Sequence, residues 1–139
     1  GLFFGLGSIG ALLFNGLHIG AAAGHITHLG YIQTFWGFVA GHSALELNAI
    51  VLSGAAGFKL GMALVAPGRR TRPRALRDES KKAMLLMYGA AGMFILAAMV
   101  EAFWSPLRYV PPEVKYAVGI GMWLVVVGYF VFGGRRAAG

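Results

Sequence analysis

The chain has 139 residues, of which 58% are hydrophobic and only 12% are charged. Because an ordinary soluble domain carries about a quarter charged residues, this composition excludes a soluble globular protein and indicates an integral membrane protein. The formal net charge of +7 is not a nucleic-acid signature, since most of the basic residues lie in one short segment. The sequence contains no cysteine, which excludes disulfide and thiolate chemistry.

The hydrophobic residues form long runs that do not alternate with polar ones. In lipid only helices and closed barrels satisfy the backbone, and the unalternating runs exclude a barrel, so we expect an all-α, polytopic transmembrane bundle. Since about 20 apolar residues cross a bilayer, four spans are predicted, at about 1–24, 44–66, 83–104 and 114–132. Residues 1–139 should form a single membrane domain. Because the chain starts at Gly1 within a predicted helix, we expect it to be the C-terminal part of a longer protein.

A basic segment at 67–82 separates the second predicted span from the third. Its arginines and lysines outnumber its acids by seven to two, and a second basic stretch, "GGRRAAG", follows the fourth span. In a four-span topology both lie on one side of the membrane, and the positive-inside rule makes that side cytoplasmic. The arginines of the predicted cytoplasmic loop are Arg69, Arg70, Arg72, Arg74 and Arg77.

The connection at 25–43, "HITHLGYIQTFWGFVAGHS", is then predicted to face outward. It is too apolar for a solvated loop and too short for a span with two turns. An amphipathic interfacial helix or a re-entrant segment suits it, with Tyr31, Phe35 and Trp36 anchoring it, because aromatic residues settle at the headgroup level.

Two acids and a histidine stand near the outer ends of the second and third spans. His42 and Glu46 are four residues apart and therefore share a helix face. Glu101 is expected at a similar depth, where two neighbouring carboxylates can share a proton or bind a cation. With Asn15 from the first span, these residues form a predicted buried polar junction. Intramembrane acids are costly, so they serve either as structural contacts or as a functional site, and the sequence leaves both readings open.

Small residues recur every fourth position after Glu46, at Ala49, Ser53, Gly57 and Gly61. Such a ladder allows another helix to approach closely, either within the monomer or in an oligomer.

The remaining histidines, His18, His25 and His28, carry no compact metal-binding signature such as HExxH. We therefore expect no metal site and no cofactor. No nucleophile is paired with a base in the sequence, so no catalytic residue is predicted and a non-enzymatic role is favoured.

Several motifs together resemble the stage II sporulation protein M family of prokaryotic membrane proteins. They are an Asn-Gly pair at Asn15, the His42–Glu46 pair in "GHSALELNAI", the small residues of "SGAAG", and the helix end "VEAFWSP". The chain departs from the family pattern at Asn48, where the motif usually has proline. The founding members act in spore engulfment, where they are thought to scaffold peptidoglycan-degrading partners. The resemblance implies a multi-pass protein of the inner (plasma) membrane and carries no established catalytic residues.

These observations favour a membrane scaffold or partner-recruiting subunit that is linked to cell-envelope remodelling. We expect it to work in the lipid bilayer as a homo-oligomer or with other membrane proteins. The alternative is a transporter-like or ion-handling protein that uses Glu46 and Glu101. A third reading, an intramembrane metal-dependent hydrolase, requires a third ligand such as His42 to converge with the two acids.

Overall fold

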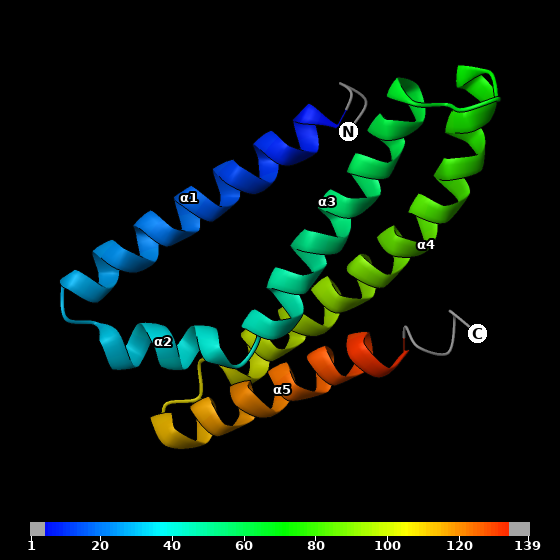
Figure 1. The fold of residues 1–139 in the computed structure, drawn as a ribbon. Helices are drawn as coiled ribbons and strands as arrows, with labels where there is room; N and C mark the ends of the chain where they lie inside the picture. Colours follow the sequence, from blue (N-terminus) through cyan, green and yellow to red (C-terminus); the bar gives the residue numbers. More distant parts are fainter. Residues whose placement is uncertain (1–4, 134–139) are drawn as a thin grey trace. The chain divides into compact units, whose positions relative to one another are not determined.

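The computed structural model describes residues 5–133; the start of the first predicted span (1–4) and the C-terminal basic stretch (134–139) lie outside the described residues. Within the described range the chain forms helices joined by short connections, with no strand (Figure 1). The helices are α1 (Leu6–His28), α2 (Ile32–Ala40), α3 (Ser43–Val65), α4 (Arg72–Met99), its π-helical continuation η1 (Val100–Trp104) and α5 (Pro112–Gly133).

The all-α fold and the four predicted spans are confirmed. Within residues 5–133, four helical stretches are long and apolar enough to cross a membrane, namely α1, α3, α4 continued by η1, and α5. Helix α2, with nine residues, reaches only about 13 Å at 1.5 Å per residue and is too short to cross a bilayer. It lies within the predicted outer segment, and its position at the membrane interface stays a prediction.

The segment expected to be a loop at 67–82 is mostly helix. Only a short turn containing Gly68, whose φ is +65°, follows α3 before α4 begins at Arg72. The physical reason is composition, since Arg, Ala, Leu, Glu and Lys are all strong helix formers. Pro73 stands in the first turn, where a missing backbone N–H costs nothing. The first turns of α4 therefore carry the charges, and the apolar part of the span follows.

The chain divides into two compact units. The first comprises Gly1–Ala22 and Asn48–Met93, and the second comprises Ala23–Leu47 and Phe94–Gly139. Helices α1, α3 and α4 each contribute residues to both units.

In the first unit, α1 packs on α3 through glycine. A side chain at Gly54 would start only 2.6 Å from Cδ1 of Leu12, so the leucine fills the space that the glycine leaves open. Gly5, with a φ of +82°, lies in the same way against the ring of Phe58. A larger residue at Gly54 would push the two helices apart.

The faces that α3 and α4 bury in the first unit are lined by alanine. Ala56 and Ala63 of α3 are at most 4% exposed, and so are Ala75, Ala83 and Ala90 of α4. Such small side chains let helix backbones approach closely in a membrane.

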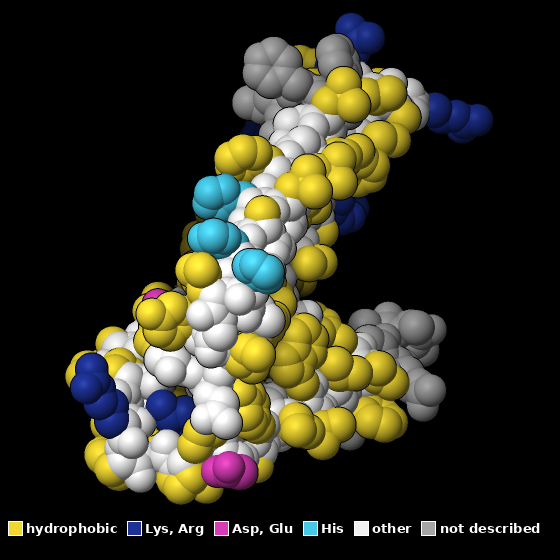
Figure 2. Space-filling view, turned by 90° about the vertical axis from the view of Figure 1, so that its left-hand side faces the viewer, with side chains coloured by type: hydrophobic (Ala, Val, Ile, Leu, Met, Phe, Trp, Pro, Cys, Tyr) yellow, Lys and Arg dark blue, Asp and Glu magenta, His cyan; other side chains and the backbone are white. Residues whose placement is uncertain are grey.

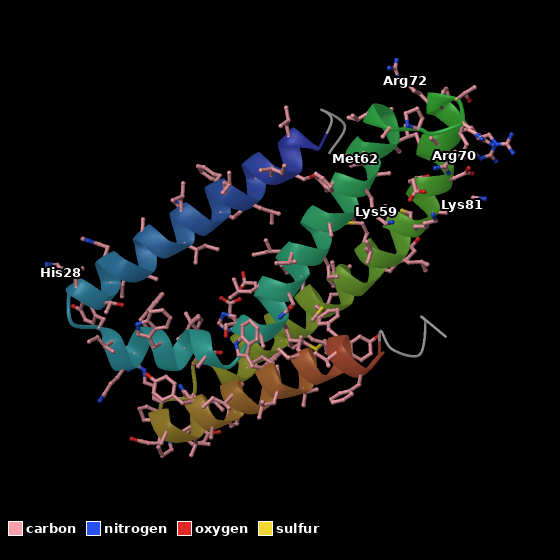
Figure 3. The ribbon with its side chains drawn as sticks, viewed as in Figure 1. His28, Lys59, Met62, Arg70, Arg72 and Lys81 are labelled. Carbon is pink, nitrogen blue, oxygen red and sulfur yellow. The ribbon has the colours of Figure 1, made fainter. Side chains whose placement is uncertain are left out.

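Ion pairs join the charged ends of α3 and α4 in the same unit. The ammonium of Lys59 lies 3.5 Å from the carboxylate of Glu79, which also pairs with Lys82 at 3.0 Å and with Arg70 at 3.7 Å. Figure 3 shows Lys59 and Arg70 at this end of the two helices. The pairs link α3 to α4 beside the basic segment.

In the second unit, α2 packs on α5. Gly119 of α5 lies directly against the backbone carbonyl of Ala40, too close for any side chain. The indole N–H of Trp123 donates to the hydroxyl of Ser43 at 3.3 Å, which fixes the start of α3 to α5. This packing positions the connection between α2 and α3, where His42 stands.

Candidate functional site

His42 is the centre of a buried polar contact in the second unit. It is 4% exposed, its Nδ1 lies 3.3 Å from the hydroxyl of Ser105, and the ring of Phe38 meets it edge-on at 5.5 Å. On the other side of the imidazole, Nε2 lies 3.6 Å from the carboxylate of Glu46. That separation is too long for a hydrogen bond, so Glu46 forms an ion pair only with a protonated imidazole.

Ser105 joins His42 to the rest of the second unit. The serine is 2% exposed, and its backbone carbonyl accepts a hydrogen bond of 2.8 Å from the ammonium of Lys115. The start of α3, the end of the α4–η1 helix and the first turns of α5 therefore meet at one serine. A Glu–His–Ser order resembles the chain of contacts in serine hydrolases, but the 3.6 Å between the Glu46 carboxylate and Nε2 of His42 exceeds a hydrogen bond, so the three side chains do not form a hydrogen-bonded triad.

A π-helical turn places Ser105 in this contact. The amide of Ser105 bonds the carbonyl of Val100, five residues back, at 2.9 Å. A π turn inserts one extra residue and so rotates everything after it by about 100° relative to an unbroken α-helix. The buried alanines of α4, at Ala83, Ala90 and Ala97, recur every seventh residue, and the extra residue brings Ser105 rather than residue 104 to the next buried position. Glu101 is exposed.

The four residues of the predicted polar junction differ in exposure and in the contacts that they make. His42 is buried, Glu46 has 44% of its side chain exposed, and Glu101 is exposed with no hydrogen bond or ion pair to any described residue. Asn15 belongs to the first unit and donates its side-chain amide to the carbonyl of Ala11 at 2.9 Å. Only His42 and Glu46 are brought together, and a junction of all four stays a prediction.

The predicted packing ladder is only partly buried. Ala49 and Gly61 are buried, whereas Ser53 and Gly57 are half-buried, and the Ser53 hydroxyl bonds its own helix at the Ala49 carbonyl, 2.8 Å away. Residues four apart drift by about 40° per step around an α-helix, whereas residues seven apart drift by about 20°. The buried row on α3 accordingly has a spacing of seven, and runs through Ala49, Ala56 and Ala63.

The arginines of the predicted basic loop are all exposed. Arg69 and Arg70 lie in the turn before α4, and Arg72, Arg74 and Arg77 lie on the first turns of α4. Arg70 pairs with Asp78 at 3.3 Å. The cytoplasmic location of this segment stays a prediction.

Nothing in the described part of the chain gathers three or more histidine, aspartate or glutamate side chains in a group that could hold a metal ion. The convergence that a metal-dependent hydrolase requires is therefore not found between residues 5 and 133.

A feature of α1 that the sequence reasoning missed is a row of open glycines. A side chain at Gly16, Gly20 or Gly24 would meet nothing within 4 Å. The three glycines are four residues apart and drift by about 40° per step, so they lie within about 80° of one another around α1. The signal was present in the sequence as two consecutive small-xxx-small steps, the pattern that membrane helices use to pack together.

A second exposed stripe of α1 is polar. Asn15, His18 and His25 follow one another at spacings of three and seven, which places them on one face, and all three are exposed. Figure 2 shows histidine side chains following one another along this exposed surface. Polar side chains in the middle of a membrane span normally face protein or water rather than lipid.

One family model matches the chain over most of its length. The family model of Stage II sporulation protein M matches residues 1–106, a range that includes Asn15, His42, Glu46 and Glu101, while α5 lies beyond it. Neither a curated protein nor a solved structure matches the chain. With three quarters of its length covered by the match, this multi-pass membrane protein belongs to the stage II sporulation protein M family.

Proposed function

We propose that this chain is an assembly subunit of a membrane complex, which holds a transmembrane helix of a partner against α1. The observation that carries the proposal is the row of Gly16, Gly20 and Gly24, which leaves open space along a membrane-spanning helix. Glycines in such a row allow two backbones to approach closely, and close approach is what stabilises helix pairs in lipid.

The polar stripe of α1 lies on nearly the opposite side of the helix from the glycine row, since successive residues turn by about 100°. Asn15 and His18 lie near the middle of a 23-residue helix, where lipid chains cannot satisfy an amide or an imidazole. A second protein surface, distinct from the helix on the glycine row, would provide hydrogen bonds there. A row of glycines is also self-complementary, so a second copy of the chain is a suitable partner.

Family membership supports the cellular setting. We propose the plasma membrane of a prokaryote, with Arg69 to Arg77 on the cytoplasmic side and a scaffolding role in cell-envelope remodelling. Under this proposal His42 and Ser105 are structural and keep the second unit rigid, and Glu46 is a partner of the His42 imidazole.

Crosslinking of the full-length protein in native membranes tests the proposal. Gly20→Leu fills the open row of α1 and should abolish the crosslinked species of the wild type. Gly121→Leu is the matched control, because a side chain at Gly121 of α5 also meets nothing within 4 Å. Crosslinking that survives in Gly20→Leu but is lost in Gly121→Leu would move the contact surface to α5 and overturn the proposal.

The rival function is ion handling, and the π turn at Glu101 favours it, because π turns inside membrane helices often mark functional positions. The two functions are separated by Glu101→Gln. Unchanged crosslinking with altered ion flux in reconstituted vesicles would support transport, whereas unchanged flux would leave assembly as the better explanation.

A further inference from the structure

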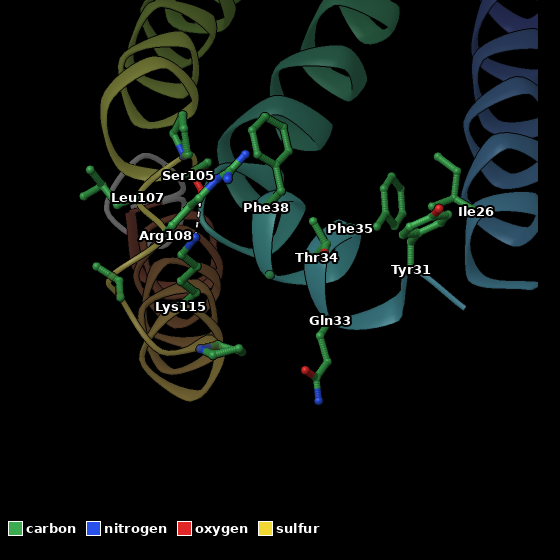
Figure 4. A pocket seen from close by; sticks show the side chains of 14 residues that line it. Ile26, Tyr31, Gln33, Thr34, Phe35, Phe38, Ser105, Leu107, Arg108 and Lys115 are labelled. Atoms are coloured by element: carbon green, nitrogen blue, oxygen red, sulfur yellow. Dashed lines mark hydrogen bonds between the residues drawn. The ribbon is translucent and has the colours of Figure 1, made fainter. Parts of the chain in front are cut away.

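A cavity of about 800 Å³ lies in the second unit, between α2 and the connection that joins η1 to α5. Figure 4 shows Arg108 and Lys115 on the side of the connection and α5, and Thr34, Phe35 and Phe38 on the side of α2. The cavity therefore has one cationic wall and one largely aromatic wall.

The two cations have unused hydrogen-bonding capacity. The ammonium of Lys115 is held by a single hydrogen bond, to the Ser105 carbonyl, and an ammonium has three donors. Arg108 is exposed and has no hydrogen bond or ion pair with any residue between 5 and 133. No aspartate or glutamate among the described residues lines the cavity, and Glu113, at the start of α5, is not part of its wall.

The position of these cations is unusual for a membrane protein. The η1–α5 connection lies at the opposite end of the α4–η1 span from the basic segment, so the positive-inside rule predicts that it faces outward. Lysine and arginine are depleted on the outer side. Topology therefore does not explain why two such residues line one cavity there. A bound anion would explain it.

The apolar wall narrows the chemistry of that anion. Besides Phe35 and Phe38, the cavity is lined by Ile26, Leu107 and Val110. A fully solvated anion gains nothing from such groups, whereas an amphiphile places its charged head against the cations and its apolar part against the rings. Phosphate groups suit the cations, because several oxygens can accept from an arginine and a lysine together.

We propose that the cavity between α2 and the η1–α5 connection binds the phosphate group of an anionic phospholipid of the outer leaflet, through Arg108 and Lys115. The lipid would occupy the space between the two elements and hold α2 in place beside the connection. Arg108 and Lys115 lie beyond residues 1–106 that match the family, whereas the α2 side of the cavity lies within them.

The absence of cysteine allows a site-specific reporter. Thr34→Cys, labelled with a trifluoromethyl thiol reagent, places a single ¹⁹F probe on the cavity wall of the full chain in phosphatidylcholine nanodiscs. We expect the ¹⁹F resonance to shift saturably as phosphatidylglycerol replaces phosphatidylcholine. A probe at Thr71→Cys, in the turn before α4, reports any general effect of surface charge.

Variants assign the shift to the two cations. Each basic residue near an anionic surface contributes about 1 kcal/mol, so Arg108→Gln should weaken the apparent affinity about fivefold, and the double variant with Lys115→Met about 25-fold. Arg77→Gln, which removes an exposed arginine of α4, should leave the Thr34→Cys titration unchanged.

Inorganic phosphate added to phosphatidylcholine nanodiscs identifies the source of the anion. No shift with phosphate, together with a shift for phosphatidylglycerol that Arg108→Gln weakens, supports the lipid site. A shift with inorganic phosphate alone would overturn the lipid source and assign the site to a soluble anion. No shift in either titration, or a phosphatidylglycerol shift unchanged in Arg108→Gln, would overturn the proposal.

Discussion

The hydrogen bond between His42 and Ser105 should measurably stabilise the second unit. Both side chains are almost completely buried, at 4% and 2% exposure, and Nδ1 and Oγ are 3.3 Å apart. A buried hydrogen bond contributes about 1 kcal/mol net, and double-mutant cycles in a membrane protein average about 0.6 kcal/mol with a maximum of about 1.7 kcal/mol. The expected coupling between the two side chains is therefore about 0.6–1.5 kcal/mol.

The magnitudes of the single variants follow from burial. His42→Ala removes the hydrogen bond and the edge contact with Phe38, which is worth about 0.5–1.5 kcal/mol beyond area burial, and leaves a cavity. Ser105→Ala removes only a hydroxyl, but leaves a buried imidazole nitrogen without its partner, at about 1–3 kcal/mol. His42→Ala should therefore cost at least as much free energy of unfolding as Ser105→Ala.

The assay is a double-mutant cycle on the free energy of unfolding, measured in mixed micelles by circular dichroism. The control cycle pairs His42→Ala with Ser53→Ala, because the Ser53 hydroxyl bonds its own helix at Ala49 and is in the other unit. Its coupling should be zero within about 0.3–0.5 kcal/mol. A coupling for His42 and Ser105 that is no larger than the control would refute the buried contact.

Three further outcomes are expected. Gly119→Ala should lower the free energy of unfolding by about 1–3 kcal/mol, because the added methyl group would meet the backbone of α2. Gly121→Ala should not lower it, and equal thermal denaturation midpoints for the two variants would contradict the α2–α5 packing. Glu79→Gln should lower the free energy of unfolding at low salt and less so at high salt, because the Lys59 side chain that pairs with Glu79 is 45% exposed and salt screens the pair. A loss of free energy that does not depend on salt would contradict an electrostatic cause. Glu101→Gln should change the free energy of unfolding by no more than about 0.5 kcal/mol, because the Glu101 side chain is exposed without a partner among the described residues. A loss above about 2 kcal/mol would contradict this and support the predicted polar junction.

The membrane class and the four spans could be predicted because they depend on composition and on the length of apolar runs. Those properties are local, and the bilayer sets a length that each run must satisfy. The start of α4 was harder to place, because charged residues that form helix well look like a loop when hydropathy is the only guide. At Arg72 to Lys82, helix propensity was the better guide than polarity.

The arrangement around His42 could be predicted only in part. The spacing of four between His42 and Glu46 is a local property, and the two side chains lie 3.6 Å apart. The contact with Ser105 depends on a π turn, for which the sequence has no local code.

The small-residue rows illustrate the same limit. On α3 a ladder with a spacing of four predicts a packing face, and the alanines that are buried on this helix recur every seventh residue, at Ala49, Ala56 and Ala63. On α1 the glycines with a spacing of four, at Gly16, Gly20 and Gly24, have no side chain or backbone of another element within 4 Å of the position that a Cβ would take. Sequence identifies which helices can pack closely, while the partner of each face depends on tertiary packing.

The claim that α1 holds a partner helix is tested most directly by photocrosslinking beside its glycine row. Leu17 is 75% exposed and flanks Gly16 and Gly20, so Leu17→Cys carrying a benzophenone should form adducts with protein in native membranes. Leu124→Cys, on a 70% exposed position of α5, should form adducts with lipid alone. Lipid adducts alone from both positions would contradict an assembly role for α1.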